Sequence, residues 1–350
     1  MTAEATAPVG DPTADRHLLW LPDRGPSPIP ESLIPWAAHA CGPLTWTADE
    51  TPGHWHARVP LEDLDAGALC VPSLVPGAVD VRGYAMTLTW DDGGRLPLAP
   101  IFTDPALKAL WPAASMATIT TAAGALIGGL DCVEAAARTR APQLHVHAVT
   151  DGPAPQAALL VGTRPRHLAC DDRSGDADEL DVPALSQMSR TAEIARHVCS
   201  PVSIAMVLGQ MGLSVEPEAF ARSVEHPHHG RLFGMWPLNL AWAEKAGAAG
   251  LVRVFTRPDE AAALLARGHP LVTSIRFETG RLPGAPLART GGHLVVLRGM
   301  AGDRVLVNDP AAPDDATVAR HYDRRAFLDA WLADRGVAYV LWPRAREIAP

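Results

Sequence analysis

Short apolar or alternating runs, each bounded by Gly, Pro or Asp, follow one another through the first half of the chain. They read HLLWLP (17–22), HWHARVPL (54–61), YAMTLTW (84–90), LHVHAVT (144–150) and AALLVG (157–162). Short strands separated by turn residues are typical of an all-β sandwich. The pattern therefore predicts a β-rich, sandwich-like domain over residues 17–168, and it leaves open whether the stretch 115–142 holds a helix.

Changes in composition mark the two ends of this β-rich region. Residues 1–16 are polar and rich in proline, which predicts a flexible N-terminus. The segment CDDRSGDADELD (170–181) is acidic and poor in apolar side chains, so we expect an interdomain linker over residues 169–184. From Leu185 onward, helical and strand-like patterns alternate, which indicates an α+β domain over residues 185–350.

The second half opens with an apolar helical pattern that starts at a cysteine. The run CSPVSIAMVLGQMGL (199–213) has little polar surface, which predicts a helix buried on nearly all sides. Pro201 suits the first turn, where an N–H would be unpaired anyway, Ser200 can cap the helix, and Gly212 suits its end. Cys199 is thus expected at a helix N-terminus, where the helix dipole and free N–H groups stabilise a thiolate.

A predicted hairpin in the C-terminal third can supply the base that such a cysteine needs. The segment GGHLVVLRGMAGDRVLVNDP (291–310) holds two β-branched runs around a Gly-rich connection. A three-residue loop at 300–302, with its glycine in the left-handed conformation, is a favoured solution. That register places His293 directly opposite Asp309 on one face of the hairpin, and it points Asn308 to the other face.

These three side chains would form one chemical unit. An imidazole can take the proton from the Cys199 thiol while a carboxylate fixes the imidazole tautomer. Taken alone, Cys199 could be a small buried hydrophobe, as free cysteines often are, and His293 and Asp309 could merely end two strands. The helix and the hairpin together favour a catalytic set of Cys199, His293 and Asp309.

Charge and composition exclude several other classes of protein. The formal net charge is −9, so nucleic acid, which requires a basic face, is not an expected partner. No uncharged apolar run reaches membrane-spanning length, and residues 1–16 carry no secretory pattern. The five cysteines are scattered without CxxC spacing, which indicates free thiols in a reducing compartment. We therefore expect a cytoplasmic protein with no membrane partner.

Other histidines near the predicted site have simpler interpretations. His226, His228 and His229 form an HPHH cluster that lacks the Cys or carboxylate spacing of a zinc site. We expect a solvated loop near the cleft and no metal. His197 directly precedes the helix and is expected at its rim, where it would contact substrate or tune the thiol.

The remaining candidates are expected to be structural. His145 and His147 alternate along one strand and should lie on an exposed face of the first domain. Trp236, in GMWPLN, could line the cleft, although tryptophan is more often part of a core. Four cysteines have no recognisable base and are interpreted as structural: Cys41, Cys70, Cys132 and Cys170.

Several motifs in the second half resemble those of one known family. They are Gln187, CSPVSIAMVL (199–208), GGHLVVLRG (291–299), VLVNDPA (305–311) and HYDRRAFLDAW (321–331). In this order they resemble the C39-like group of papain-fold cysteine peptidases, over roughly residues 185–345, and GMWPLN resembles a segment of its actinobacterial members. The resemblance implies a papain-like domain with Cys199 as nucleophile, His293 as base and Asp309 as orienting residue.

The same resemblance assigns a fourth residue and extends to the first half. Gln187 corresponds to the oxyanion-hole glutamine, whose side-chain N–H would act beside the backbone N–H of Cys199. The first half is similar, more distantly, to the β-rich domain that precedes this module in some actinobacterial relatives. Many relatives carry CGP where this chain has Cys199-Ser200-Pro201.

The sequence thus predicts a cysteine hydrolase, a peptidase or amidase that forms an acyl-enzyme on Cys199. The expected partner is a peptide, amide or acyl substrate, and no metal or organic cofactor is implied. One alternative is an acyltransferase or amide-bond-forming biosynthetic enzyme with the same triad. Another is a non-catalytic binding protein on the same fold, although binding alone has no need of all three triad residues. The oligomeric state is not set by the sequence.

Overall fold

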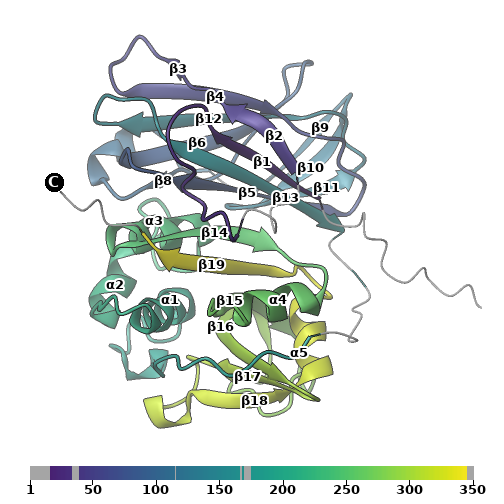
Figure 1. Cartoon of the computed structure of the whole chain (residues 1–350). Helices are drawn as coiled ribbons and strands as arrows, with labels where there is room; N and C mark the ends of the chain where they lie inside the picture. The colour runs from purple at the N-terminus through teal and green to yellow at the C-terminus, as the bar shows by residue number, and fades with distance from the viewer. Residues whose placement is uncertain (1–15, 34–38, 115, 166–167, 169–174, 345–350) are drawn as a thin grey trace, which may run out of the picture.

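The computed structural model describes residues 16–33, 39–114, 116–165, 168 and 175–344, so nearly all of the predicted flexible segment 1–16 lies outside the described residues. Within these ranges antiparallel sheets dominate and helices are few, which confirms the α+β class. None of the described helices has the length and apolar character needed to cross a membrane. In Figure 1 the first half of the chain stacks on the second half.

The first half forms two sheets. Their strands are β1 (Arg16–Pro22), β2 (His39–Leu44), β3 (Thr47–Ala48), β4 (His54–Pro60), β5 (Ala68–Pro76), β6 (Val81–Thr89), β7 (Arg95–Pro97), β8 (Ile101–Phe102), β9 (Ala117–Thr121), β10 (Gly124–Gly128), β11 (Val133–Ala137), β12 (Gln143–Thr150) and β13 (Ala157–Pro165). One sheet runs β2-β1-β13-β5-β11-β10-β9, and the other β3-β4-β12-β6-β7 with β8 against β6. All five predicted runs coincide with strands, and the open stretch 115–142 forms β9, β10 and β11 in its described residues.

Alternating side chains explain why these two sheets stay together. Along β12, Leu144 and Val146 are buried while the residues between them are only partly covered. They meet side chains of the other sheet, such as Leu74 and Val161, in one apolar cluster. A period of two along β12 therefore becomes one buried face on its sheet, whereas β5 of the other sheet is buried on both faces.

The second half is one sheet with helices on both faces. Its strands are β14 (Ala248–Val254), β15 (Leu271–Phe277), β16 (Thr290–Ala301), β17 (Arg304–Asn308), β18 (Ala319–Asp323) and β19 (Val337–Pro343), in the order β14-β19-β15-β16-β17-β18. The helices are α1 (Cys199–Gln210), α2 (Pro217–Ser223), α3 (Trp236–Lys245), α4 (Pro258–Leu265) and α5 (Arg324–Trp331). Side chains of α1, α2 and α3 belong to one core cluster, and those of α4 and α5 to another.

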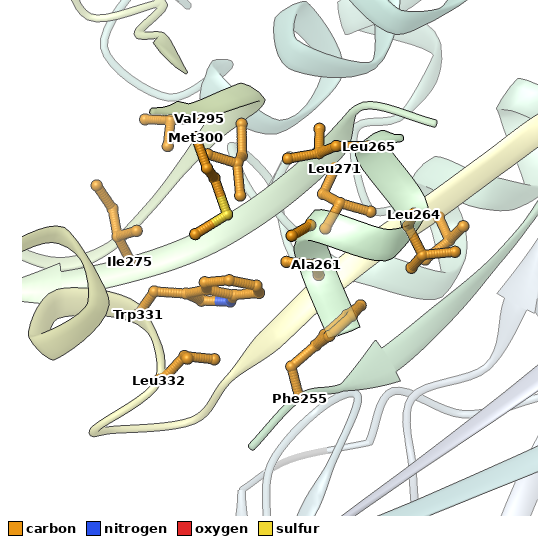
Figure 2. Packing of buried hydrophobic residues seen from close by; sticks show 14 of the residues in the cluster. Phe255, Ala261, Leu264, Leu265, Leu271, Ile275, Val295, Met300, Trp331 and Leu332 are labelled. Atoms are coloured by element: carbon orange, nitrogen blue, oxygen red, sulfur yellow. The ribbon is translucent and has the colours of Figure 1, made fainter. Parts of the chain in front are cut away.

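The core on the α4 and α5 side shows how this arrangement is held. Figure 2 shows Leu264 and Leu265 of α4 close to Leu271 of β15, with Trp331 of α5 near Ile275. Burying a side chain of this size stabilises the fold by roughly 1.5–3 kcal/mol. This packing fixes β15 and β16 in place, and β16 carries His293.

The two halves share buried contacts where β5 and β13 meet β14. The Val252 N–H donates to Ser73 Oγ over 2.9 Å, and His17 Nε2 lies 3.1 Å from the Val254 carbonyl oxygen. A Cβ added to Gly162 of β13 would come within 2.8 Å of Val254. The backbone of β13 therefore approaches the Val254 side chain so closely that only glycine fits at position 162.

The described part of the predicted linker, residues 175–184, lies against β16 and β17 of the second-half sheet. Ala177 forms a bridge with Met300, and the Leu180 N–H donates to the Arg298 carbonyl. Asn308, on the face opposite that of Asp309 as predicted, donates to the Val182 carbonyl over 3.0 Å. Residues 169–174 of this segment lie outside the described residues.

Candidate active site

The candidate nucleophile lies at the start of α1. The helix begins at Cys199, and Gly212 follows its end with φ of 75°, as the sequence predicted. The predicted burial is also confirmed, since Ser200 to Leu208 are all buried, whereas Cys199 is partly exposed. The N-cap residue, Val198, offers no side-chain cap, and the backbone N–H of Ser200 hydrogen-bonds the Cys199 sulfur.

The predicted role of Ser200 as a helix cap is wrong. Its hydroxyl lies 2.8 Å from the hydroxyl of Tyr339 on β19, and both side chains are buried. A residue inside the first turn of a buried helix points its side chain into the core, where its hydroxyl must find a partner. Ser200 thus joins α1 to the sheet beneath it.

His293 and Asp309 form a short buried contact. His293 Nε2 lies 2.7 Å from Asp309 Oδ1, and the two residues are only 2% and 1% exposed. Because the carboxylate can only accept, Nε2 carries the proton. His293 also hydrogen-bonds the Cys199 side chain, which leaves Nδ1 as the nitrogen for that contact.

The turn of this hairpin differs from the prediction. Ala301 pairs with Arg304, so a two-residue turn at Gly302 and Asp303 joins β16 to β17 instead of the predicted three-residue loop. Gly302 does adopt a positive φ, 55°. Two-residue turns match the twist of the strands they join, and a positive φ is what they require.

A bulge restores the face on which His293 lies. The pairing shifts between 297 and 299, after which Val296 pairs with Asn308. Continued along the strand, this register sets His293 two positions away from Asp309 and not directly opposite, as predicted. A shift of two keeps both side chains on one face, whereas a shift of one would separate them.

Asp309 has two further donors that hold it in place. The Ala311 N–H donates to Oδ1 over 2.9 Å, and the Tyr322 hydroxyl donates to Oδ2 over 2.7 Å. Sequence reasoning missed Tyr322. The available signal was its place in HYDRRAFLDAW (321–331), one of the motifs that carry the family resemblance.

The charges of the site favour an ion pair between sulfur and imidazole. Burial would lower the pKa of His293, but the charge and hydrogen bond of Asp309 and the contact with Cys199 raise it to about 10. Burial would raise the pKa of Cys199, but the hydrogen bond and charge of His293 lower it. Burial also opposes ionisation of Asp309, yet His293 and Tyr322 keep its pKa below the usual value. Each shift therefore moves its group toward the charged form, which is thiolate for Cys199, imidazolium for His293 and carboxylate for Asp309.

Gln187 lies in a short 3-10 turn, Gln187–Ser189, between the two parts of this site. Its backbone N–H donates to the Pro310 carbonyl over 2.8 Å, next to Asp309. Its side-chain Nε2 donates to the Ala195 carbonyl over 2.8 Å, in the turn that leads to Cys199. An amide nitrogen has two hydrogens, so one remains available to another acceptor.

His197 is exposed, as expected for a rim residue. Arg231 Nη2 donates to His197 Nε2 over 3.2 Å and to the Glu193 carbonyl over 3.0 Å. Arg231 itself has φ of 62°, a left-handed conformation that costs a non-glycine residue energy. No pattern in the sequence indicates this contact, which joins residues 34 positions apart.

The expectation of a solvated HPHH loop is wrong. His226 is 1% exposed, and His229 Nε2 contacts the Ala114 carbonyl of the first half over 2.9 Å. His228 packs edge-on against Phe102, also in the first half. The cluster is therefore part of the boundary between the halves. Within the described residues, no three His, Cys, Asp or Glu side chains are placed to hold a metal ion.

The other singled-out residues have structural surroundings. His145 and His147 are partly buried and not freely exposed, because His147 stacks on His56 and accepts a hydrogen bond from Trp111. Trp236 is 4% exposed and belongs to the core on the α1 side.

The remaining cysteines divide between described and undescribed positions. Cys70 and Cys132 are free and buried. The side chain of Cys41 and the whole of Cys170 lie outside the described residues.

Comparison with known proteins gives one family match. Residues 179–339 match the model of the Peptidase_C39 like family. No curated protein matches the chain. A solved double glycine motif protease from an AMS/PCAT transporter, in complex with a leader peptide, has 19% identity and a TM-score of 0.33, covering 49% of this chain and 99% of that one. A C39-like peptidase structure from Bacillus anthracis has 16% identity and a TM-score of 0.36, covering 48% and 98%.

Proposed function

We propose that residues 179–339, which match the model of the Peptidase_C39 like family, form the core of a papain-like cysteine peptidase or amidase domain. The observation that carries the proposal is the contact of His293 with both Cys199 and Asp309. A nucleophile, a base and an orienting carboxylate in this order are what acyl transfer from an amide requires.

The proposed reaction proceeds through an acyl-enzyme. The Cys199 thiolate attacks the carbonyl carbon, and the C–N bond breaks as imidazolium of His293 delivers its proton to the leaving amine. The second N–H of Gln187 Nε2 and the backbone N–H of Cys199 would donate to the oxyanion. Water, deprotonated by His293, then releases the acid and regenerates the thiol.

We further propose a peptide as substrate and a β-rich, sandwich-like first domain over residues 17–168, joined to the catalytic domain at 185–350 by residues 169–184. A leader peptide is bound by the double glycine motif protease, which supports a peptide for this chain by family likeness alone. Free Cys70 and Cys132 accord with a reducing, cytoplasmic setting.

A peptide-library digest read by mass spectrometry tests the proposal. The parent protein should cleave a subset of peptides, and Cys199→Ala and His293→Ala should each remove essentially all cleavage because the two residues act as a unit. Asp309→Ala should lower turnover less, since Asp309 exchanges no proton with substrate.

The same digest separates the alternatives. Cleavage that survives in Cys199→Ala overturns the nucleophile. Transfer of the acyl group to an added amine in preference to water would indicate an acyltransferase, and peptide binding without any covalent adduct would indicate a binding protein.

A further inference from the structure

Asp309 presents its two carboxylate oxygens to different partners. Oδ1 accepts from His293 and from the Ala311 N–H, while Oδ2 accepts from the hydroxyl of Tyr322 over 2.7 Å. Asp309 and Tyr322 are each 1% exposed. In the described part of the chain Oδ2 has no second donor, so Tyr322 alone satisfies that oxygen.

The phenol of Tyr322 is held rigidly by its surroundings. Tyr322 pairs with Val305 across β17 and β18, and its ring stacks on Phe327 of α5 with centroids 6.3 Å apart. Asp323, the next residue, caps α5 by accepting from the Ala326 N–H over 2.8 Å. Strand and helix therefore fix the hydroxyl on both sides, as a positioning group requires.

A buried carboxylate beside an imidazolium needs such support. Burial pushes the pKa of Asp309 upward, and the hydrogen bond from Tyr322 is one of the contacts that push it down. The charged groups acting on the pair are His293, facing Asp309, and Arg320 on β18, whose charge acts on Tyr322. If Asp309 took a proton, it would stop stabilising the imidazolium, and the thiolate would be lost with it.

We propose that Tyr322 is a positioning residue that keeps Asp309 ionised and aimed at His293. This inference rests on the proposed function, because it assigns Tyr322 to the same site. Tyr322 acts through Asp309 and touches neither substrate nor sulfur. A buried tyrosine needs a hydrogen-bond partner wherever it lies, so the experiment must distinguish this role from plain packing.

The test is the pH dependence of Cys199 alkylation by iodoacetamide in the full-length Tyr322→Phe variant. Loss of one hydrogen bond to a charged group should move the acid limb of the profile upward by about one pH unit. The rate should fall about tenfold at pH values below the acid limb of the parent, and the loss should vanish at pH values well above it. Tyr84→Phe, which removes a buried phenol hydroxyl from β6 in the first half, is the matched control and should leave the profile unmoved.

Two further variants keep the result interpretable. 3-Fluorotyrosine at position 322 preserves the packing and is a stronger donor, so it should move the acid limb downward even if Tyr322→Phe folds poorly. In an Asp309→Asn background, Tyr322→Phe should cause no additional shift, because the group it supports is gone.

The outcomes separate the two proposals. An unmoved acid limb in folded Tyr322→Phe, or an equal shift in the Asp309→Asn background, overturns the role of Tyr322 alone. If Cys199 of the parent shows no preferential alkylation at all, the proposed function itself fails.

Discussion

Buried histidines and cysteines occur both at the candidate site and outside it, and the charges of their neighbours differ. At the candidate site His293 and Cys199 lie beside the carboxylate of Asp309. Outside it, His17 is buried against Val254 at the boundary between the halves and Cys70 is buried in the core of the first half, and the charge that acts on His17 is that of an arginine. The fold removes water from all of these positions, so the neighbours decide the chemistry.

The pKa values of His17 and His293 shift in opposite directions. Burial lowers the pKa of His17, Arg253 lowers it further, and a hydrogen bond to Val254 only partly offsets them, which leaves it at about 3. Burial acts on His293 in the same sense, but Asp309 reverses the result and raises the pKa to about 10.

The cysteines follow the same rule. Burial raises the pKa of Cys70 to about 12 and also raises that of Cys132, with the nearby charge of Asp131 adding to the effect. The pKa of Cys199 is lowered because His293 outweighs burial. A partner of opposite charge to the ionised side chain, and not burial, distinguishes the candidate site from these buried positions.

The largest expected effect is selective alkylation at pH 7. Iodoacetamide should modify Cys199 about a thousand times faster than Cys70 or Cys132, because among these three described cysteines only Cys199 has a lowered pKa and a partly exposed surface. Peptide mapping by mass spectrometry measures the three rates. In denaturant the rates should become similar, and faster labelling of Cys70 in the folded protein would break the comparison.

A second effect separates thiolate formation from oxyanion stabilisation. Gln187→Ala should lower kcat by roughly two to three orders of magnitude while Cys199 alkylation stays intact, as expected for one lost oxyanion donor. Gln210→Ala, at the far end of α1, is the matched control. Turnover equal to that of the parent would place the donor elsewhere, with residues 188–198 the first segment to examine.

His17 should make stability depend on pH. The unfolded chain binds a proton near pH 6.5 and the folded chain only near pH 3, so stability present above pH 6.5 is lost as the pH falls toward 3. By pH 5 the loss from this residue is about 2 kcal/mol. Urea unfolding of His17→Gln and of the parent over this pH range isolates the contribution of His17 to the free energy of unfolding. Glutamine keeps a donor for the Val254 carbonyl and does not titrate. Equal pH slopes for the two proteins would contradict the assignment.

The smallest expected effect is that of Tyr339→Phe, and it is compared with the effect of Tyr322→Phe. Tyr339→Phe removes the partner of the Ser200 hydroxyl and should lower the free energy of unfolding by about 1–2 kcal/mol. Because Ser200 carries no charge, the acid limb of Cys199 alkylation should move less than in Tyr322→Phe. A shift as large in both variants would mean that any buried hydroxyl near the site acts alike.

Features set by neighbouring residues in sequence were predictable. The start of α1 at Cys199 and its stop before Gly212 follow from local backbone preferences. The hairpin was predictable as an element, but its register was not, because the turn and the bulge at 297–299 each shift the pairing. The contact between His293 and Asp309 is present despite that error, since two compensating changes preserved the face.

Features set by distant partners were not predictable. From the sequence Ser200 is interpreted as a helix cap, whereas in the structure its hydroxyl contacts Tyr339. Tyr322 looks like a core aromatic in the sequence, whereas in the structure its hydroxyl donates to Asp309. The HPHH residues looked solvated because nothing in their own segment reveals that Ala114 and Phe102 cover them. Single-sequence reasoning sees polarity and spacing, and it does not see which surface will cover a loop.

The burial of β5 has a consequence for how this protein can be divided. All seven interior residues of β5 are buried, and so is every residue of β14, on which it lies. A chain shortened to begin at residue 185 would expose β14 and part of α3 as a bare apolar face, which favours aggregation. The first half therefore serves as a covalently attached cover for β14. A recombination event that replaced the first half would also require new side chains on β14 to match the new partner.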